Sequence, residues 1–276
     1  MRTELRDCRS ILTRTGGFLS GFSHTLNPYR GCSFGHSLCG IACYAPALIR
    51  SKTDDWGGFL EIKQNAAEIY RKEIVRERRR GPVRIFCASV TDPYVPQENR
   101  YRITRALLEA MVEEPPDRLA LQTHTPGPLR DLDLLSRLRC DLTVQITVET
   151  DRDSIPGLPP HAFAPRVRLD ALKQIKDAGL RAVGVVAPLL PIDNVEAFAA
   201  DLDECCTSVI VDHYLIGDGS KDGARTKRRG LPQRLVDAGF ESWTRLDALH
   251  ETAAVFRRVL GEGRVGVSAE GFNAPT

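Results

Sequence analysis

Three cysteines in one short segment are the residues of this 276-residue chain best suited to chemistry. Cys32, Cys39 and Cys43 lie in the stretch 27–46, which is rich in Gly and Pro and therefore predicts a loop. Thiolates gathered in this way hold a metal. A structural zinc site takes four protein ligands, whereas an iron–sulfur cluster on three cysteines leaves one iron open to bind a substrate. The choice between a closed site and an open one decides the function.

His36 lies between the first two cysteines and keeps both kinds of site under consideration. With the three thiols it would complete a Cys3His zinc site, and it could also replace one thiol as a cluster ligand. Because thiolates are the usual ligands of iron–sulfur clusters, Cys32, Cys39 and Cys43 are the preferred set. Whether His36 is a ligand stays open at the level of the sequence.

The cysteine segment resembles the cluster loop of radical S-adenosylmethionine (SAM) enzymes, in the group related to spore photoproduct lyase. That group begins the loop with Asn-Pro-Tyr-x-Gly-Cys and ends it with Cys-Tyr-Ala, and the stretches 27–32 and 43–45 match both ends. The middle departs from the group, because its usual spacing is Cys-x3-Cys-x2-Cys and here it is Cys-x6-Cys-x3-Cys. The resemblance extends to Thr-Asp-Pro-Tyr at 91–94 and Ala-Pro-Leu-Leu-Pro at 187–191. It covers residues 25–215.

The other cysteines and the ends of the chain predict a soluble, cytoplasmic protein. Five further cysteines are scattered, at Cys8, Cys87, Cys140, Cys205 and Cys206, with no pattern of a secreted disulfide framework. The first ten residues are polar and charged, so no signal peptide is expected, and no apolar run reaches membrane-spanning length. No membrane partner is expected.

Alternating strand and helix patterns predict the fold. Apolar, β-branched runs typical of buried strands occupy 25–27, 83–90, 119–123, 142–148, 180–187 and 208–215, with a last one at 264–268. Helical periodicity marks 59–80, 98–112, 129–138, 166–178, 193–202 and 245–260. This order predicts an α/β fold, a partial (β/α)6 TIM-like barrel with parallel strands and outer helices. We expect a single domain over 1–276, with the barrel at 25–215 and a C-terminal extension at 216–276.

Polar residues at the ends of the predicted strands indicate where a cofactor would lie. In such barrels the chemistry sits at the carboxyl ends of the strands, where the cysteine loop also begins. The strand at 142–148 alternates, so that Gln145, Thr147 and Glu149 share one face. Their alternative role is hydrogen bonding inside the barrel. The residues predicted to contact SAM are Tyr44, Ser89, Thr123, Gln145, Thr147, Glu149 and Arg168.

The resemblance implies a radical SAM enzyme with two cofactors, a [4Fe–4S] cluster and SAM. The reduced cluster would cleave SAM to a 5′-deoxyadenosyl radical, which would abstract hydrogen from an unknown substrate, with flavodoxin or ferredoxin as the electron donor. Arg168, in an Arg-Leu pair as in the group, would lie near the SAM carboxylate. Spore photoproduct lyases carry a hydrogen-donor cysteine after the second strand, whereas Cys87 lies earlier on that strand and is predicted to be a buried apolar residue. Spore DNA repair is therefore not inferred.

The substrate is not defined by the sequence. Basic residues gather at 221–234, including Arg225, Arg229 and Arg234, and would suit an anionic substrate such as a nucleic acid. The net charge of +2 and the lack of aromatic residues among the basic ones argue against that reading. A small molecule or peptide is favoured. The alternative function is a non-catalytic zinc-binding Cys3His protein that associates with nucleic acid.

Overall fold

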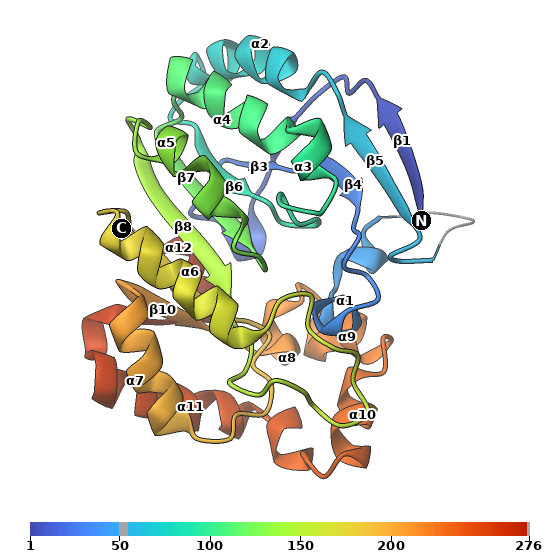
Figure 1. The fold of residues 1–276 in the computed structure, drawn as a ribbon, viewed down its shortest axis with the longest axis vertical. Helices are drawn as coiled ribbons and strands as arrows, with labels where there is room; N and C mark the ends of the chain where they lie inside the picture. The colour runs from blue at the N-terminus through green and yellow to red at the C-terminus, as the bar shows by residue number, and fades with distance from the viewer. Residues whose placement is uncertain (50–54, 275–276) are drawn as a thin grey trace.

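The computed structural model describes residues 1–49 and 55–274, and it is built around an eight-stranded sheet (Figure 1). The strand order is β11-β10-β9-β8-β7-β6-β3-β2. All neighbouring strands are parallel except β2, which is antiparallel to β3. The strands are β2 (Leu12–Arg14), β3 (His24–Leu26), β6 (Arg84–Cys87), β7 (Arg118–Thr123), β8 (Asp141–Thr147), β9 (Ala182–Val186), β10 (Ser208–Val211) and β11 (Val265–Val267).

Helices cover one face of this sheet, which we call the outer face. They are α2 (Ala66–Arg78), α3 (Glu98–Tyr101), α4 (Ile103–Glu113), α5 (Leu132–Leu135), α6 (Pro165–Asp177), α7 (Val195–Cys205) and α11 (Leu246–Leu260). Helix α2 packs against α4, and α7 packs against both α6 and α11. No helix among the described residues is both long and apolar enough to cross a bilayer.

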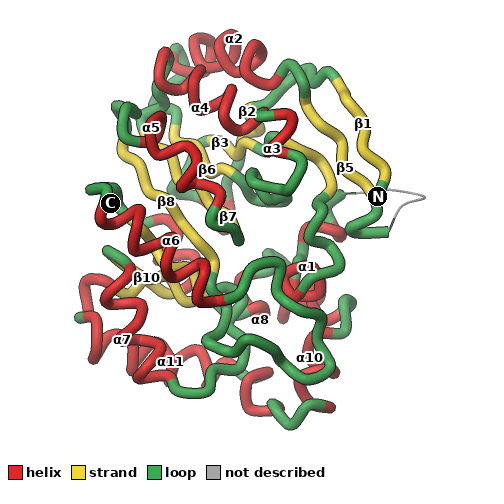
Figure 2. The backbone as a smooth tube through the Cα atoms, in the orientation of Figure 1, coloured by secondary structure: helices red, strands yellow, loops and turns green. Residues whose placement is uncertain are grey.

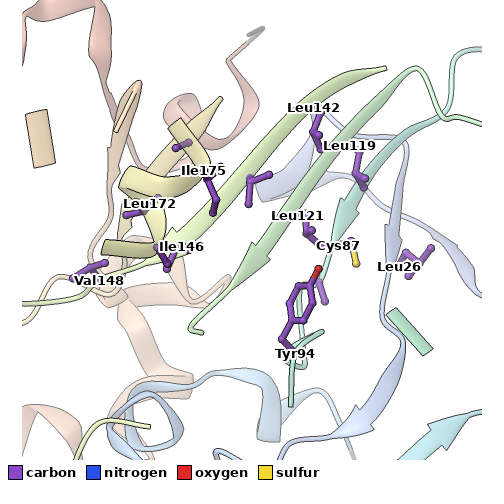
Figure 3. Close-up of a cluster of buried hydrophobic side chains, with 14 of the residues drawn as sticks. Leu26, Cys87, Tyr94, Leu119, Leu121, Leu142, Ile146, Val148, Leu172 and Ile175 are labelled. Carbon is purple, nitrogen blue, oxygen red and sulfur yellow. The ribbon is translucent and has the colours of Figure 1, made fainter. Parts of the chain in front are cut away.

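Side chains alternate along the strands between the outer face and an inner face. On β8, Val144 and Ile146 belong to the core that includes Leu172 and Ile175 of α6 (Figure 3). The intervening residues face the other way. Phe86, Ala120, Val185 and Ile210 form a separate core on the inner face. This alternation follows from the period of two in a strand, and it gives the inner face to the residues that can meet a ligand.

The inner face is closed at one side by aromatic residues from both ends of the chain. The short helix η1 (Gly17–Leu19) brings Phe18, and α12 (Ser268–Asn273) brings Phe272. The two rings lie 5.6 Å apart between centroids, and Phe272 also meets Phe86 at 6.2 Å. Such tilted aromatic pairs add stability beyond their buried area. The C-terminal extension therefore takes part in the core, through both β11 and α12.

A second, three-stranded sheet was not predicted. It has the order β1-β5-β4, formed by β1 (Arg2–Arg6), β4 (Tyr29–Gly31) and β5 (Phe59–Lys63). The predicted helix at 59–80 is therefore wrong in its first part, where Phe59, Leu60 and Ile62 form a strand. The predicted helix at 98–112 is interrupted at Arg102, whose φ of 52° is left-handed and ends α3. The predicted helix at 129–138 reduces to η3 (Gly127–Asp131) and α5.

The α/β class and the parallel strands are confirmed, with the predicted strand positions shifted by a few residues at their ends. The predicted strand at 208–215 ends at Val211, and α8 (Tyr214–Gly217) follows it. In the part of the chain that the structure describes, β2 and β11 are the two edges of the main sheet and do not pair with each other, so the sheet is open.

Loops gather at the carboxyl ends of the parallel strands (Figure 2). The cysteine loop with α1 (Leu38–Ala42) and the segment 148–164 lie there, next to the C-terminal helices α9 (Ala224–Lys227) and α10 (Leu231–Asp237). These three regions are in contact. Leu38 donates its backbone N–H to Pro160, and Arg234 donates to the carbonyl of Gly157.

Candidate functional site

The cysteine loop is held by Asn27 at its beginning. The Asn27 side-chain oxygen accepts hydrogen bonds from the backbone N–H groups of Ser89 and Val90, both at 3.0 Å. Its own carbonyl accepts from the Lys63 ammonium at 2.7 Å. By accepting these three hydrogen bonds, the half-buried Asn27 fixes the chain leaving β3 against the chain leaving β6. The Asn-Pro-Tyr motif is therefore a structural tie.

Asp92 is the centre of a second tie. One oxygen of its buried carboxylate accepts from Thr123 at 2.7 Å and from the backbone of Tyr94 at 2.8 Å, and the other accepts from the backbone of His124 at 2.8 Å. The neighbouring Thr91 hydroxyl donates to the carbonyl of Gly31 at 2.6 Å. The Thr-Asp-Pro-Tyr motif thus joins the ends of β6 and β7 to the residue before Cys32.

The loop needs glycine where it turns towards Cys32. Gly31 has a φ of +85°, and a Cβ there would lie 2.4 Å from the carbonyl oxygen of Phe59. Both observations exclude a larger residue without a shift of β4 or β5.

A cavity of about 170 Å³ lies between the cysteine loop and the strand ends. A single water needs only about 10–15 Å³ of such space, so the cavity is large enough for an organic ligand. Its wall carries all three cysteines of the loop and residues that follow β6, β7, β9 and β10. The polar and cysteine lining residues are Cys32, Cys39, Cys43, Tyr44, Ser89, Thr91, Asp92, Gln122, His124, Asp212, Tyr214, Asp218 and Thr226.

The surroundings of the three thiols favour their neutral, protonated form. Burial raises the pKa of Cys32 to about 12 and that of Cys43 to about 11, and it raises the pKa of Cys39 well above its ordinary value. Ionised Cys32 and Cys43 would each raise the pKa of Cys39 further, so the three lie near one another. A bound metal would lower these pKa values again, because it stabilises the thiolate form directly.

Three cysteine thiols are donors of the kind that hold an iron–sulfur cluster. Among the described residues, no three His, Cys, Asp or Glu side chains converge tightly enough to ligate a single metal ion. A cluster places each thiolate on a different iron, so its ligands surround a larger group. His36 does not line the cavity with the thiols, since its ring meets Asp55 at 2.5 Å and its side chain is 65% exposed.

Two of the residues predicted to contact SAM line this cavity. Tyr44 follows Cys43, and its hydroxyl donates to the carbonyl of Ser89 at 2.6 Å, so the two residues connect the cysteine loop to the end of β6. Thr123 is buried one layer behind the wall, where it donates to Asp92. The prediction that these three contact SAM stays a prediction.

None of the other four predicted contacts lines the cavity: Gln145 and Thr147 lie on β8, Glu149 follows the strand, and Arg168 reaches Glu149 from α6. Gln145 and Thr147 are buried, and Thr147 accepts a hydrogen bond from Gln122, which does line the cavity, at 3.2 Å. Glu149 and Arg168 form a buried ion pair at 2.6 Å. Burial raises the pKa of Glu149, but the charges of Arg168 and His124 outweigh it and leave that pKa below its ordinary value. Arg168 therefore has an internal partner.

Sequence reasoning missed the polar residues after β10. Asp212 follows the strand directly, and Asp218 and Thr226 come from the helices beyond it. All three are buried and line the cavity. Burial raises the pKa of Asp212 from 3.8 to about 7. The signal was present, because a carboxylate immediately after an apolar β-branched run marks the carboxyl end of a parallel strand.

Basic residues of the segment 221–234 anchor the loops around the cavity. Arg225 donates to the carbonyl of Asp218 at 2.8 Å, and Arg229 donates to the carbonyl of Gly40, inside the cysteine loop, at 3.1 Å. The Arg229 charge also lowers the pKa of Cys43, against the larger effect of burial. Cys87, by contrast, points to the outer core beside Leu26 and Leu121 and away from the cavity, as predicted (Figure 3).

Comparison with known proteins places the chain among relatives described only as uncharacterized. It is 30% identical over 194 residues to a protein of Mycobacterium tuberculosis, 26% over 184 residues to one of Acidianus two-tailed virus, and 23% over 175 residues to one of Methanocaldococcus jannaschii. These matches cover 67%, 66% and 63% of this chain. They span only 55%, 58% and 62% of the relatives' own lengths. No family model matches the chain.

Solved structures identify the fold. Spore photoproduct lyase complexed with dinucleoside spore photoproduct superposes with a TM-score of 0.62 at 16% identity, covering 96% of this chain and 81% of that one. A double mutant of the lyase with bound AdoMet and the same dinucleoside gives 0.61 at the same identity and coverage. The chain has the spore photoproduct lyase fold. The predicted resemblance to that group is confirmed at the level of the fold.

The Arg168–Glu149 pair yields a stability prediction. Arg168→Leu should lower the free energy of unfolding by about 3–5 kcal/mol, because it leaves the Glu149 carboxylate buried without its main partner. Arg166→Leu on the same helix is the control, since Arg166 is 76% exposed, and it should change stability by about 0.5 kcal/mol or less. Denaturant unfolding measures both. Equal effects of the two substitutions would contradict the assignment.

Asp212 yields a prediction of pH dependence. Its pKa is raised from 3.8 to about 7, so the folded state loses stability as the pH rises from about 4 to about 7, and the loss levels off above pH 7. Asp212→Asn should therefore raise the free energy of unfolding at pH 8 by up to about 4 kcal/mol, with the gain vanishing near pH 4. Asp222→Asn, at an exposed position, should have no such effect. A difference that does not change with pH would argue against a raised pKa.

Proposed function

We propose that the protein is a radical SAM enzyme whose Cys32, Cys39 and Cys43 hold a [4Fe–4S] cluster and whose cavity binds SAM. The single observation that carries the proposal is that the three thiols of a lyase-like loop line one cavity with the strand ends. The shared fold adds support, since one lyase structure contains AdoMet. When bound, the cluster and SAM together supply a 5′-deoxyadenosyl radical that abstracts hydrogen from a substrate.

The chain's own residues position the reactants and keep the site dry. Asn27 and Asp92 fix the cysteine loop against β6 and β7, so that the thiols keep one arrangement. Tyr44 and Ser89 close the wall between the loop and the strand end. The apolar residues Phe18, Leu19, Phe86 and Phe272 line the cavity and would keep water away from a bound ligand. A water-excluded, preorganised site is what a reactive radical requires of a protein.

We extend the proposal to the architecture and the partners. The strands β3 and β6 to β10 would be the six strands of a partial (β/α)6 barrel, with the cavity at their carboxyl ends. The protein would need a one-electron donor such as flavodoxin or ferredoxin and a substrate that enters the same cavity. The Cys3His zinc alternative is disfavoured, because His36 pairs with Asp55 at the surface.

Cluster ligation tests the proposal directly. After anaerobic reconstitution the wild-type chain should be brown, contain about four irons and four sulfides, and form 5′-deoxyadenosine from SAM when reduced. Cys32→Ala, Cys39→Ala and Cys43→Ala should each lose the visible absorbance. His36→Ala should keep it, and so should Cys140→Ala, which removes a thiol that does not line the cavity. A colourless His36→Ala protein, or a brown Cys43→Ala protein, would show that another set of ligands holds the metal.

Arg229 yields a prediction about retention of the cluster. Its hydrogen bond to Gly40 fixes the loop between Cys39 and Cys43, and outer partners of this kind typically change metal affinity about 10–100-fold. Arg229→Leu should therefore lose iron to a chelator at least about tenfold faster than wild type. Arg228→Leu, the exposed neighbour, is the matched control. Identical rates for the two variants would remove Arg229 from the support of the loop.

A further inference from the structure

The end of the cavity beyond the cysteine loop contains buried polar atoms without partners. Asp212 is 5% exposed and Thr226 is 1% exposed, and both line the cavity. Within residues 1–49 and 55–274, Asp212 Oδ1 has no hydrogen-bond partner, and the Thr226 hydroxyl makes no hydrogen bond of normal geometry although it lies beside the Asp218 carboxylate. Buried polar atoms are almost always paired, so a partner from outside the chain is expected at these two positions.

Asp218 differs from these two because the protein already satisfies it. Its carboxylate accepts from the backbone of Ser220 at 2.8 Å, from the Ser220 hydroxyl at 2.5 Å and from the backbone of Thr226 at 2.9 Å. These bonds hold the Asp218 pKa low against its burial, so it adds a negative charge beside Asp212. Gly217 keeps the approach open, since a Cβ there would lie 1.7 Å from Asp212 Oδ2.

The charges around the cavity select against an anionic ligand. Three carboxylates, those of Asp92, Asp212 and Asp218, line it, and in the described chain no Lys or Arg does. The basic side chains lie in a neighbouring groove and have protein partners. They are Arg14 with Glu77, Arg30 with Glu61, Lys63 with the Asn27 carbonyl, and Arg225 with the Asp218 carbonyl. A phosphate inside the cavity would meet like charge without a counter-ion.

The remaining wall is apolar and aromatic. Phe272 packs edge to face on Phe86 and at a tilt on Phe18 around the inner end, with Leu19, Ala187 and Pro188 beside them. A flat apolar group fits such a wall, because aromatic rings stack or meet edge to face at these spacings.

We propose that Asp212 and Thr226 form the substrate-recognition subsite of this cavity, and that it takes an amine or hydroxyl carried on an apolar or aromatic body. The inference rests on the proposed function, and it names the substrate class for the same cavity. The Asp212 carboxyl accepts the hydrogen bond of the ligand, and Thr226 adds a second contact. The apolar body lies against the three phenylalanines. SAM also carries an amine, so the test separates the two ligands.

The experiment measures the affinity of three small probes for the full chain by ligand-observed NMR titration, before and after reconstitution with iron and sulfide. Benzylamine and benzyl alcohol carry the expected groups, and phenyl phosphate carries an anion on the same ring. Wild type should bind the first two and not the third at equal concentration. Asp212→Asn should weaken benzylamine at least about tenfold, as expected for a lost bond to a charged group. Thr226→Val should weaken both donors, and Asp222→Asn should change nothing.

Calorimetric titration of SAM into the reconstituted Asp212→Asn variant assigns the carboxyl to one ligand. Unchanged SAM affinity together with weakened benzylamine supports the proposal. Lost SAM affinity with unchanged benzylamine overturns it, because the carboxyl then serves SAM. Binding of phenyl phosphate as tight as benzylamine, or no benzylamine binding to wild type, also overturns it. Failure of the proposed function appears separately, as absent cluster absorbance and no 5′-deoxyadenosine from wild type.

Discussion

The buried carboxylate of Asp92 is the interaction on which the cysteine loop and the cavity depend. It accepts hydrogen bonds from three residues of β7 and of the turn after β6, and its neighbour Thr91 bonds to Gly31 of the loop. Taking a carboxylate out of water is costly unless its oxygens are well satisfied, and here both are. The loop therefore has one low-energy position relative to the strand ends, and this also fixes the positions of the three thiols.

A parallel network repeats this solution on the outer side of the loop. Tyr29 donates its hydroxyl to the buried carboxylate of Glu98, which also accepts from the backbone of Thr104 and from Arg130. Glu98 begins α3, so the start of a helix and the strand leading to Cys32 share one anion. The two networks explain why the polar motifs of this chain extend well beyond its cysteines. They serve to hold a loop that has little regular structure of its own.

The sequence predicted every strand of the main sheet except β2, because most of the predicted strands are apolar, β-branched runs. It failed where that signal is weak or ambiguous. Strand β1 is exposed and polar, as edge strands often are, and gives no hydrophobic pattern. At β5, Leu60 and Ile62 are followed by the buried Ala66 at a helical spacing, so strand and helix read as one element. The left-handed Arg102 that ends α3 has no local sequence signal.

The residues of the candidate site also fall into those that the sequence could predict and those that it could not. The cysteines and Tyr44 were predictable, because they lie together in the chain and share a motif. Asp212 had a local signal at the end of its strand, but its grouping with Thr226 and the aromatic wall had none, because it joins β10, α9, η1 and α12, which are far apart in sequence. The alternation of β8 correctly predicted that its polar residues share one side of the sheet. However, Arg168 pairs with Glu149, and Gln122 of the neighbouring strand β7 covers Thr147. Alternation fixes the side of a sheet on which a residue lies, whereas its neighbours decide whether it reaches the cavity.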